Sequence, residues 1–460
     1  MDALSKNDII ELNITDMTAD GEGIGKYNGF PFFVKDAIIG DVISAKVVKL
    51  KKTYGYARVE SVLTPSPDRV TPHCSIARQC GGCQIQAMDY KAQLAFKEKM
   101  VRNNLSRIGG IDPDTYTFLP IVGMDNPYEY RNKAQFPVSK DKNGNIVMGF
   151  YAGRTHSVIG CERCHIGDRV NEPVLAAVRD YMTVCTIPPY NEIDTSGTVR
   201  HILIRVGKKT GEVMVCLVIN ADTLPDTSYL VEKLCDSVPG IASVMININK
   251  EKTNVILGPV SKTIWGKSYI EDFIGDIRYR ISPNSFYQVN PIQTEKLYTK
   301  ALSLAELTGN ETVWDLYCGI GTISLFLAKK ARKVYGVEIV PQAIEDARQN
   351  ALLNGIDNAT FFAGKAEEVV PAYYDEHRDE HADVMVVDPP RKGCDEKLLS
   401  TMISMSPERI VYVSCDSATL SRDLKFLTSN GYEVRQVQCF DQFPHTCHVE
   451  TVACLQRVDM

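Results

Sequence analysis

A glycine-containing loop between a predicted strand and a predicted helix constrains the fold of this chain most strongly. Val313–Asp315 has the pattern of a strand, Gly319 and Gly321 lie in the loop that follows, and Thr322–Lys330 has the pattern of a helix. A second predicted strand, Val334–Glu338, comes next. This order predicts an α/β fold with a Rossmann-like, doubly wound sheet.

The same loop indicates a nucleoside ligand that carries an amino acid. Glu338 stands 19 positions after Gly319, where an acid can accept both ribose hydroxyls. A nicotinamide dehydrogenase would have G-x-G-x-x-G, but Ser324 occupies the third glycine position. Asp315 precedes the loop and can pair with an ammonium group. The pattern favours S-adenosylmethionine (SAM) over a pyrophosphate, and the alternative is a crossover with a structural role only.

Two later strands end in residues that suit a methyltransferase with a cysteine nucleophile. Val384–Val387 precedes Asp388–Gly393, which reads Asp-Pro-Pro-Arg-Lys-Gly, and another apolar run precedes Cys415. Adenine-N6 methyltransferases have an aromatic residue after Pro-Pro, where this chain has Arg391. Cytosine-C5 enzymes place a cysteine beside that motif or after the next strand, which is the position of Cys415.

Such chemistry needs a thiolate and a base. A lone strand-end cysteine is more often a small buried apolar residue. Here Ser417 can cap the next helix, whose N-terminus would favour the Cys415 thiolate. Thiolate addition to C6 of a pyrimidine makes C5 nucleophilic, and a base must then remove the C5 proton. Glu450, in the last predicted β run (Phe443–Val452), can be that base, although such acids are more often surface residues.

Residues 8–63 predict a small barrel of short β-strands. Basic and aromatic side chains fall together on its later strands: Lys46, Lys49, Lys51, Lys52, Tyr54, Tyr56 and Arg58. This strip suits single-stranded nucleic acid, and the alternative is a solvated barrel face. Because the net charge of the chain is −6, any nucleic-acid surface must be a local patch.

Three cysteines within ten residues predict a metal site after the barrel. Cys74, Cys80 and Cys83 form this group, and Gly-Gly between the last two lets both sulfurs turn toward one centre. A fourth ligand can come from Cys161 or Cys164, and the spacing does not choose between them. Zinc is often held by two Cys-x2-Cys pairs, whereas a three-plus-one set favours a four-iron cluster.

The length of 460 residues predicts two or three domains. We expect a barrel over residues 1–64, a central α+β domain with the cluster site over 65–275, and the α/β domain over 276–460. The sequence has no apolar run long enough for a membrane span and no signal-peptide pattern at its start, so we expect a cytoplasmic protein that does not contact membranes. No obligate protein partner is indicated.

These motifs together resemble the RNA uracil-5-methyltransferase family of the RumA/TrmA type, in particular its RumA-like branch that acts on 23S ribosomal RNA. The resemblance covers nearly the whole chain, including the cysteine group, the run Asn284–Asn290, the Asp-Pro-Pro-Arg-Lys-Gly motif and His448-Val-Glu450. It implies a class I SAM-dependent methyltransferase domain and an OB-like, RNA-binding barrel called a TRAM domain. One departure is Ser417, where the family usually has proline.

By that resemblance Cys415 is the nucleophile, Glu450 removes the C5 proton, and Phe286 stacks on the flipped uracil. The implied SAM contacts are Gln288, Tyr317, Glu338 and Asp388. The implied ligands of a 4Fe-4S cluster are Cys74, Cys80, Cys83 and Cys164. Cys164 is chosen over Cys161 because Cys-His-Ile after a His-Ser-Val-Ile run matches the fourth ligand of the family.

The resemblance thus predicts a SAM-dependent enzyme that makes 5-methyluridine in ribosomal RNA and flips the target base. Transfer RNA is the alternative substrate. A cytosine-C5 methyltransferase would usually have a second cysteine in the Asp-Pro-Pro motif, and Cys394 is displaced from that position. A cluster-bearing RNA-binding protein with an inactive methyltransferase fold is the remaining alternative.

Overall fold

The computed structural model describes residues 4–153 and 155–458, which form two compact units. Of these residues, the first unit combines 4–100 with 150–153, 155–161 and 443–448. The second combines 101–149, 162–442 and 449–458. Helix α1 (Tyr90–Arg107) runs from the first unit into the second.

The first unit contains the predicted barrel. Five strands close in the order β1-β2-β3-β5-β4: β1 (Ile9–Met17), β2 (Gly23–Tyr27), β3 (Phe30–Lys35), β4 (Val42–Leu50) and β5 (Gly55–Thr64). Residues along β1 alternate between exposed and buried, as expected for a strand with one face on a core. Gly55 must be glycine, because a Cβ there would lie 2.4 Å from the Phe32 ring. Short strand β9 (Val158–Gly160) also belongs to this unit.

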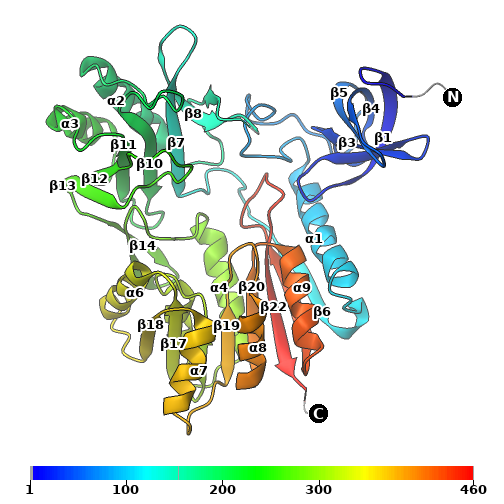
Figure 1. Cartoon of the computed structure of the whole chain (residues 1–460), viewed down its shortest axis with the longest axis vertical. Helices are drawn as coiled ribbons and strands as arrows, with labels where there is room; N and C mark the ends of the chain where they lie inside the picture. Colours follow the sequence, from blue (N-terminus) through cyan, green and yellow to red (C-terminus); the bar gives the residue numbers. More distant parts are fainter. Residues whose placement is uncertain (1–3, 154, 459–460) are drawn as a thin grey trace. The chain divides into compact units, whose positions relative to one another are not determined.

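The second unit contains a sheet of mixed direction with the strand order β13-β12-β11-β10-β7-β8. Its strands are β7 (Lys133–Lys140), β8 (Ile146–Tyr151), β10 (Val199–Val206), β11 (Val213–Ile219), β12 (Ile241–Ile248) and β13 (Val260–Gly266). β10 and β11 are buried along their whole length, so both faces of the sheet are covered. Helices α2 (Asn171–Val184) and α3 (Thr227–Ser237) pack against each other, and α3 packs on β12 (Figure 1).

The second unit also contains the predicted doubly wound sheet, in the order β18-β17-β16-β19-β20-β22-β21-β6. The strands are β6 (Thr117–Val122), β16 (Thr312–Asp315), β17 (Lys333–Glu338), β18 (Ala359–Ala363), β19 (Val384–Val387), β20 (Arg409–Ser414), β21 (Tyr432–Phe440) and β22 (Glu450–Arg457). Only β22 runs antiparallel to its two neighbours. β6 comes from the segment that we expected to be a separate central domain, and it pairs in parallel with β21.

Helices cover this sheet. They are α4 (Pro291–Ala305), α5 (Thr322–Ala328), α6 (Pro341–Leu353), α7 (Ala366–Glu376), α8 (Glu396–Met405) and α9 (Ser417–Thr428). Figure 1 shows α7, α8 and α9 side by side along one face. α4 packs against α5, β20 and β22. A one-turn 3-10 helix (Pro113–Thr115) precedes β6.

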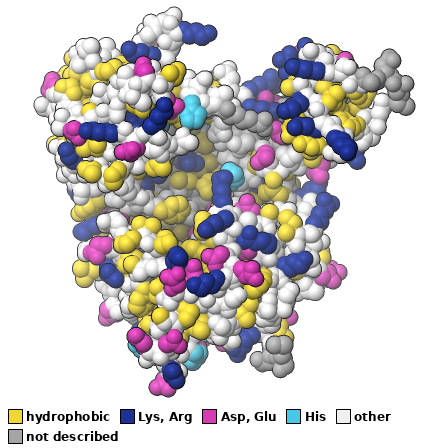
Figure 2. Space-filling view, viewed as in Figure 1, with side chains coloured by type: hydrophobic (Ala, Val, Ile, Leu, Met, Phe, Trp, Pro, Cys, Tyr) yellow, Lys and Arg dark blue, Asp and Glu magenta, His cyan; other side chains and the backbone are white. Residues whose placement is uncertain are grey.

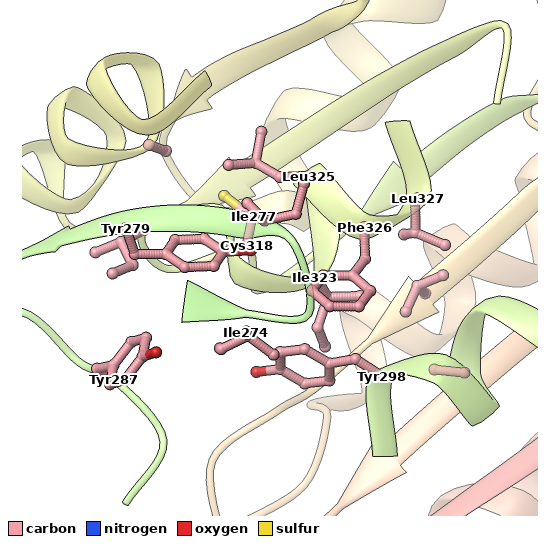
Figure 3. Close-up of a cluster of buried hydrophobic side chains, with 14 of the residues drawn as sticks. Ile274, Ile277, Tyr279, Tyr287, Tyr298, Cys318, Ile323, Leu325, Phe326 and Leu327 are labelled. Atoms are coloured by element: carbon pink, nitrogen blue, oxygen red, sulfur yellow. The ribbon is translucent and has the colours of Figure 1, made fainter. Parts of the chain in front are cut away.

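A buried hydrophobic cluster packs against helix α5, which follows the glycine loop. The hairpin of β14 (Ile270–Ile274) and β15 (Ile277–Ile281) packs against α4 and α5 (Figure 3). The Tyr279 hydroxyl in this cluster donates a hydrogen bond of 3.0 Å to the carbonyl of Thr322, the first residue of α5. The start of α5 therefore has a single position relative to the hairpin.

The prediction of a β-strand over Phe443–Val452 was wrong for the first part of this segment. The strand begins only at Glu450, and residues 443–449 form a loop. His445 has φ = 68°, a left-handed conformation that a strand does not contain, and Pro444 has no N–H to donate to a sheet. In the part of the chain that the structure describes, no helix is long and apolar enough to cross a membrane.

The barrel core gives a stability test. Phe32 is fully buried, so Phe32→Ala should lower the free energy of unfolding of the barrel by about 3 to 5 kcal/mol because it leaves a cavity. Ile9 on β1 is 59% exposed, and Ile9→Ala should stay within about 0.5 kcal/mol of the wild type. Denaturant unfolding followed by fluorescence measures both. Equal losses in the two variants would contradict this description of the core.

Candidate active site

The strand register brings the predicted site residues to one edge of the doubly wound sheet. Glu338 and Asp315 end the adjacent parallel strands β17 and β16, and Asp388 follows β19 on the other side of β16. The carboxyl ends of parallel strands point to the same edge, and the order of strands reverses between β16 and β19. This point is where open α/β sheets bind ligands.

The antiparallel strand β22 places Glu450 opposite Cys415. Ser414 at the end of β20 pairs with Thr451 of β22. In an antiparallel pair the next residue of one strand lies opposite the preceding residue of the other, so Cys415 faces Glu450. Because β22 runs in reverse, its first residue, and not its last, reaches the edge that carries Asp388. The side chain of Glu450 is buried.

Burial of several acids at this edge shifts their pKa values upward. Burial raises the pKa of Asp315 to about 6, with a smaller contribution from Glu338, while the Ser324 hydroxyl opposes the shift. Burial and the charge of Asp315 raise the pKa of Asp388 to about 7. Burial, followed by the charge of Asp388, raises the pKa of Glu450 well above its ordinary value. The carboxyl groups therefore interact along the edge as one set.

The thiol of Cys415 belongs to the same set. Burial, followed by the charges of Glu450 and Asp388, raises its pKa to about 12, while the guanidinium of Arg391 opposes this shift. Arg391 also lowers the pKa of Glu450. In the free protein these neighbours and burial favour the neutral thiol, so the expected effect of the following helix on the thiolate stays a prediction.

The capping residue of α9 differs from our expectation. Asp416, and not Ser417, is the N-cap: its Oδ1 accepts hydrogen bonds from the backbone N–H groups of Ala418 (2.9 Å) and Thr419 (3.0 Å). The Ser417 hydroxyl instead accepts a bond of 2.8 Å from Asn104 Nδ2. The partial positive charge of the helix N-terminus is thus shared with a carboxylate, which reduces its effect on Cys415.

The residues around the glycine loop fit SAM. Asp315 Oδ2 accepts a hydrogen bond of 2.6 Å from the Ser324 hydroxyl, whereas its buried Oδ1 has no hydrogen-bond partner among the described residues. A buried acceptor without a donor suits the ammonium group of an amino acid. Gly319 and Gly321 have φ values of 54° and 84°, which favour glycine. A Cβ on Gly319 would meet no described atom within 4 Å, so the loop leaves room for a ligand.

Three of the remaining predicted SAM contacts lie around this site. Gln288 is buried, and both its side chain and Asp388 interact with the Tyr298 phenol of α4. Tyr317 is half-buried beside Cys394. Glu338 Oε1 accepts a bond of 3.0 Å from the backbone N–H of Val340.

Phe286 is 68% exposed, although the loop that carries it is well anchored. The neighbouring Ser285 donates a hydrogen bond of 3.1 Å to Asp346 of α6, and its carbonyl accepts one from the buried Arg205 guanidinium. Asn132 Nδ2 donates a bond of 3.0 Å to the carbonyl of Gln288. A large aromatic ring on a fixed loop, open to solvent, is suited to stacking on a base.

The structure does not gather the predicted cluster ligands. Among residues 4–153 and 155–458, no group of three or more Cys, His, Asp or Glu side chains is arranged to hold a metal ion. Within the first unit, Cys74 and Cys80 lie close enough for their charges to interact, and the Gly82 N–H contacts Cys80 Sγ at 3.3 Å. Cys83 belongs to the same unit, whereas Cys164 belongs to the second. The cluster therefore remains a prediction.

Sequence reasoning did not assign a role to Arg391 or Tyr298. Arg391 was noticed only because it replaces an aromatic residue after Pro-Pro, yet its charge reaches both Cys415 and Glu450. Tyr298 follows the run Asn284–Asn290 by eight residues, but the sequence of its own helix carries no motif. Only the packing of α4 on the sheet reveals it.

Comparisons with known proteins identify the family of this chain. The sequence model of the tRNA (Uracil-5-)-methyltransferase family matches residues 262–458, and that of the TRAM domain matches residues 5–59. An uncharacterized RNA methyltransferase of Halalkalibacterium halodurans is 49% identical, over 98% of this chain and 98% of its own length. A second, from Listeria monocytogenes, is also 49% identical with 98% of each chain covered. The chain belongs to the RNA uracil-5-methyltransferase family.

A solved member of this family has a similar fold. The crystal structure of Pyrococcus abyssi tRNA (uracil-54, C5)-methyltransferase, in complex with S-adenosyl-L-homocysteine, is 29% identical with a TM-score of 0.78. The alignment covers 97% of this chain and 100% of that one. The protein is thus a SAM-dependent RNA methyltransferase with an N-terminal TRAM barrel, so these two parts of the predicted fold class are confirmed, while the central iron–sulfur domain stays a prediction.

The raised pKa of Asp315 gives a test of the SAM site. The carboxylate should bind the ammonium group of SAM, so affinity should weaken as the pH falls below about 6, by up to about tenfold for each pH unit. Asp315→Asn should bind SAM weakly and lose this component of the pH dependence. Calorimetric titration measures the dissociation constant. The exposed Asp357→Asn is the control, and a wild-type-like profile for Asp315→Asn would exclude Asp315 as the partner.

Proposed function

We propose that this protein methylates C5 of a uridine in ribosomal RNA, 23S in particular, with Cys415 as nucleophile and Glu450 as base. The observation that carries the proposal is the strand register, because it sets the thiol opposite a buried carboxyl group at the edge that carries Asp388. The family assignment supports a uracil substrate.

In this proposal the Cys415 thiolate forms a bond to C6 of the uracil, and the electron pair of the C5–C6 double bond moves to give an enolate. SAM, which Gln288, Asp315, Tyr317, Glu338 and Asp388 would hold, would supply the methyl group: C5 of the enolate bonds to the methyl carbon, the bond from that carbon to sulfur breaks, and S-adenosylhomocysteine leaves. The Glu450 carboxylate then takes the proton from C5, the bond between C6 and sulfur breaks, and the C5–C6 double bond reforms. Cys415 leaves as a thiolate.

Both reacting side chains must lose a proton before they can act. Their pKa values are raised by burial and by the neighbouring acids, so the free protein favours the neutral thiol and the neutral carboxyl group. The Arg391 guanidinium counters both shifts. Arg391 is therefore assigned the role of stabilising negative charge on whichever group is ionised.

RNA binding by the barrel is supported by the arrangement of its outer face. Phe33, Tyr54 and Tyr56 form an aromatic cluster with ring centroids 5.4 to 5.9 Å apart. The register places Lys49 opposite Tyr56, and Arg58 opposite both Lys35 and Lys46. Figure 2 shows Lys and Arg side chains gathered over the barrel. Stacking surfaces beside cations bind single-stranded RNA with little sequence preference.

Transfer RNA is the second candidate substrate. The observation that favours it is the likeness to the Pyrococcus abyssi enzyme, a tRNA (uracil-54, C5)-methyltransferase. The chemistry at Cys415 is the same for both, so only the RNA that carries the target uridine distinguishes them.

RNA that contains 5-fluorouridine tests the reaction and the substrate. In 5-fluorouridine a fluorine atom replaces the C5 proton, and a base cannot abstract it. The methylated base should therefore remain bound to Cys415. We expect a gel-stable complex that carries label from SAM with 23S ribosomal RNA, lost in Cys415→Ala and kept in the control Cys235→Ala. A complex with transfer RNA alone would select the second candidate. No complex with either RNA, from protein that binds SAM, would refute uridine methylation.

We also propose that Cys74, Cys80, Cys83 and Cys164 bind a 4Fe-4S cluster. Support comes from the spacing of the first three cysteines and from the proximity of Cys74 to Cys80. Anaerobically purified protein should contain iron and sulfide, and Cys83→Ser should lose both. The exposed Cys235→Ser is the matched control. Iron-free wild-type protein after anaerobic reconstitution would refute the cluster.

A further inference from the structure

The loop that carries Arg391 is held by the helix that follows the nucleophile. The Thr419 hydroxyl of α9 donates a hydrogen bond of 3.1 Å to the carbonyl of Arg391 itself. One turn later, Arg422 Nη2 donates bonds of 2.9 Å and 3.1 Å to the carbonyls of Lys392 and Cys394. Two side chains of α9, one turn apart, thus bind three backbone carbonyl groups of the loop.

The buried residue Asp423 also binds the loop that carries Arg391. Its side chain is fully buried, and Oδ2 accepts hydrogen bonds from the backbone N–H of Cys394 (2.8 Å) and from the Tyr412 hydroxyl (2.6 Å). Oδ1 accepts a bond of 2.8 Å from Arg422 Nε. These hydrogen-bond donors offset the free-energy cost of burying the carboxylate. Asp423 therefore connects α9, β20 and the loop.

The backbone of the loop is shaped for this contact. Gly393 has φ = 75°, and a Cβ there would lie 2.6 Å from both Arg422 Nη2 and Asp423 Oδ2. Only glycine combines that conformation with so close an approach of the helix. The loop therefore has one position relative to α9.

The position of the loop matters because α9 begins directly after Cys415. Asp416, the N-cap of α9, is the next residue in the chain, so the helix fixes the nucleophile at its start and the Arg391 loop one and two turns later. The charged groups that face Cys415 are Glu450 of β22 and, from the segment after β19, Asp388 and Arg391. Arg391 is the cation of this set.

We propose that Thr419, Arg422 and Asp423 are positioning residues that hold the Arg391 guanidinium beside Cys415 and Glu450. This inference rests on the proposed function of Cys415 as nucleophile. The three side chains do not themselves react. They act through Arg391, whose charge stabilises the ionised thiol and carboxyl groups, and they keep that charge in place when RNA enters the site.

The test measures the ionisation of Cys415 directly and needs no RNA. Full-length protein is alkylated with iodoacetamide from neutral to alkaline pH, and the modified Cys415 peptide is quantified by mass spectrometry. Arg391→Ala and Asp423→Asn should each slow alkylation at a given pH by about tenfold, which corresponds to a rise of one unit in the thiol pKa. Lys425→Gln, on the exposed side of α9, should match the wild type.

A double variant separates positioning from general damage. If Asp423 acts through Arg391, Asp423→Asn should have no further effect in an Arg391→Ala background, and Arg391→Lys should recover most of the rate. Thr419→Val removes only the hydroxyl that contacts the carbonyls of Arg391 and Asp416, and it serves if Asp423→Asn does not fold. Alkylation at the wild-type rate in both α9 variants, or additive effects in the double variant, would overturn the proposal. SAM affinity should stay unchanged throughout.

The same experiments distinguish this inference from the proposed function. Wild-type protein that forms no adduct with fluorinated RNA, but whose alkylation depends on Arg391 and Asp423, would refute uridine methylation and leave the positioning role standing. An RNA adduct together with an alkylation rate that does not depend on Asp423 would support uridine methylation and refute the positioning role.

Discussion

The antiparallel pairing of β22 between β20 and β21 is the constraint on which the candidate site depends. If β22 ran parallel to its neighbours, its last residue would reach the catalytic edge and Glu450 would lie at the far end of the sheet. The reversed strand instead starts at that edge, so its first residue faces Cys415. The backbone ladder of the sheet core therefore sets the proposed base opposite the proposed nucleophile, and no flexible loop is needed between the two groups.

That placement has an electrostatic cost. Asp315, Asp388 and Glu450 are brought to one edge of the sheet, and burial raises the pKa of each. A site of this kind favours positively charged ligands. Burial raises the free energy of the ionised carboxylates, and an ammonium and a sulfonium group lower it again. The Arg391 guanidinium performs part of this task within the chain, which explains why its loop is so firmly tied to α9.

Much of the fold and the site could be predicted from the sequence because their signals are local. The strand–glycine–helix pattern around Gly319, the apolar runs before Asp388 and Cys415, and the alternating strands of the barrel each lie within a short window. The position of β6 could not be predicted in this way. It pairs with β21, hundreds of residues later, and parallel pairing between distant segments leaves no local pattern. The cap at Asp416 was missed because Asp and Ser are both good N-caps at adjacent positions.

The sequence by itself determined the kind of chemistry: a SAM-type loop, a strand-end cysteine, an acid in the final strand and a basic, aromatic barrel. Those residue types and spacings follow from what methyl transfer to a pyrimidine requires. Only the tertiary structure decided which groups interact and in what protonation state. Strand order sets Asp388 between Asp315 and Glu450, and burial together with these neighbours raises the pKa of the Cys415 thiol in the free protein. Both depend on desolvation and on neighbours from distant segments, which a linear sequence does not display.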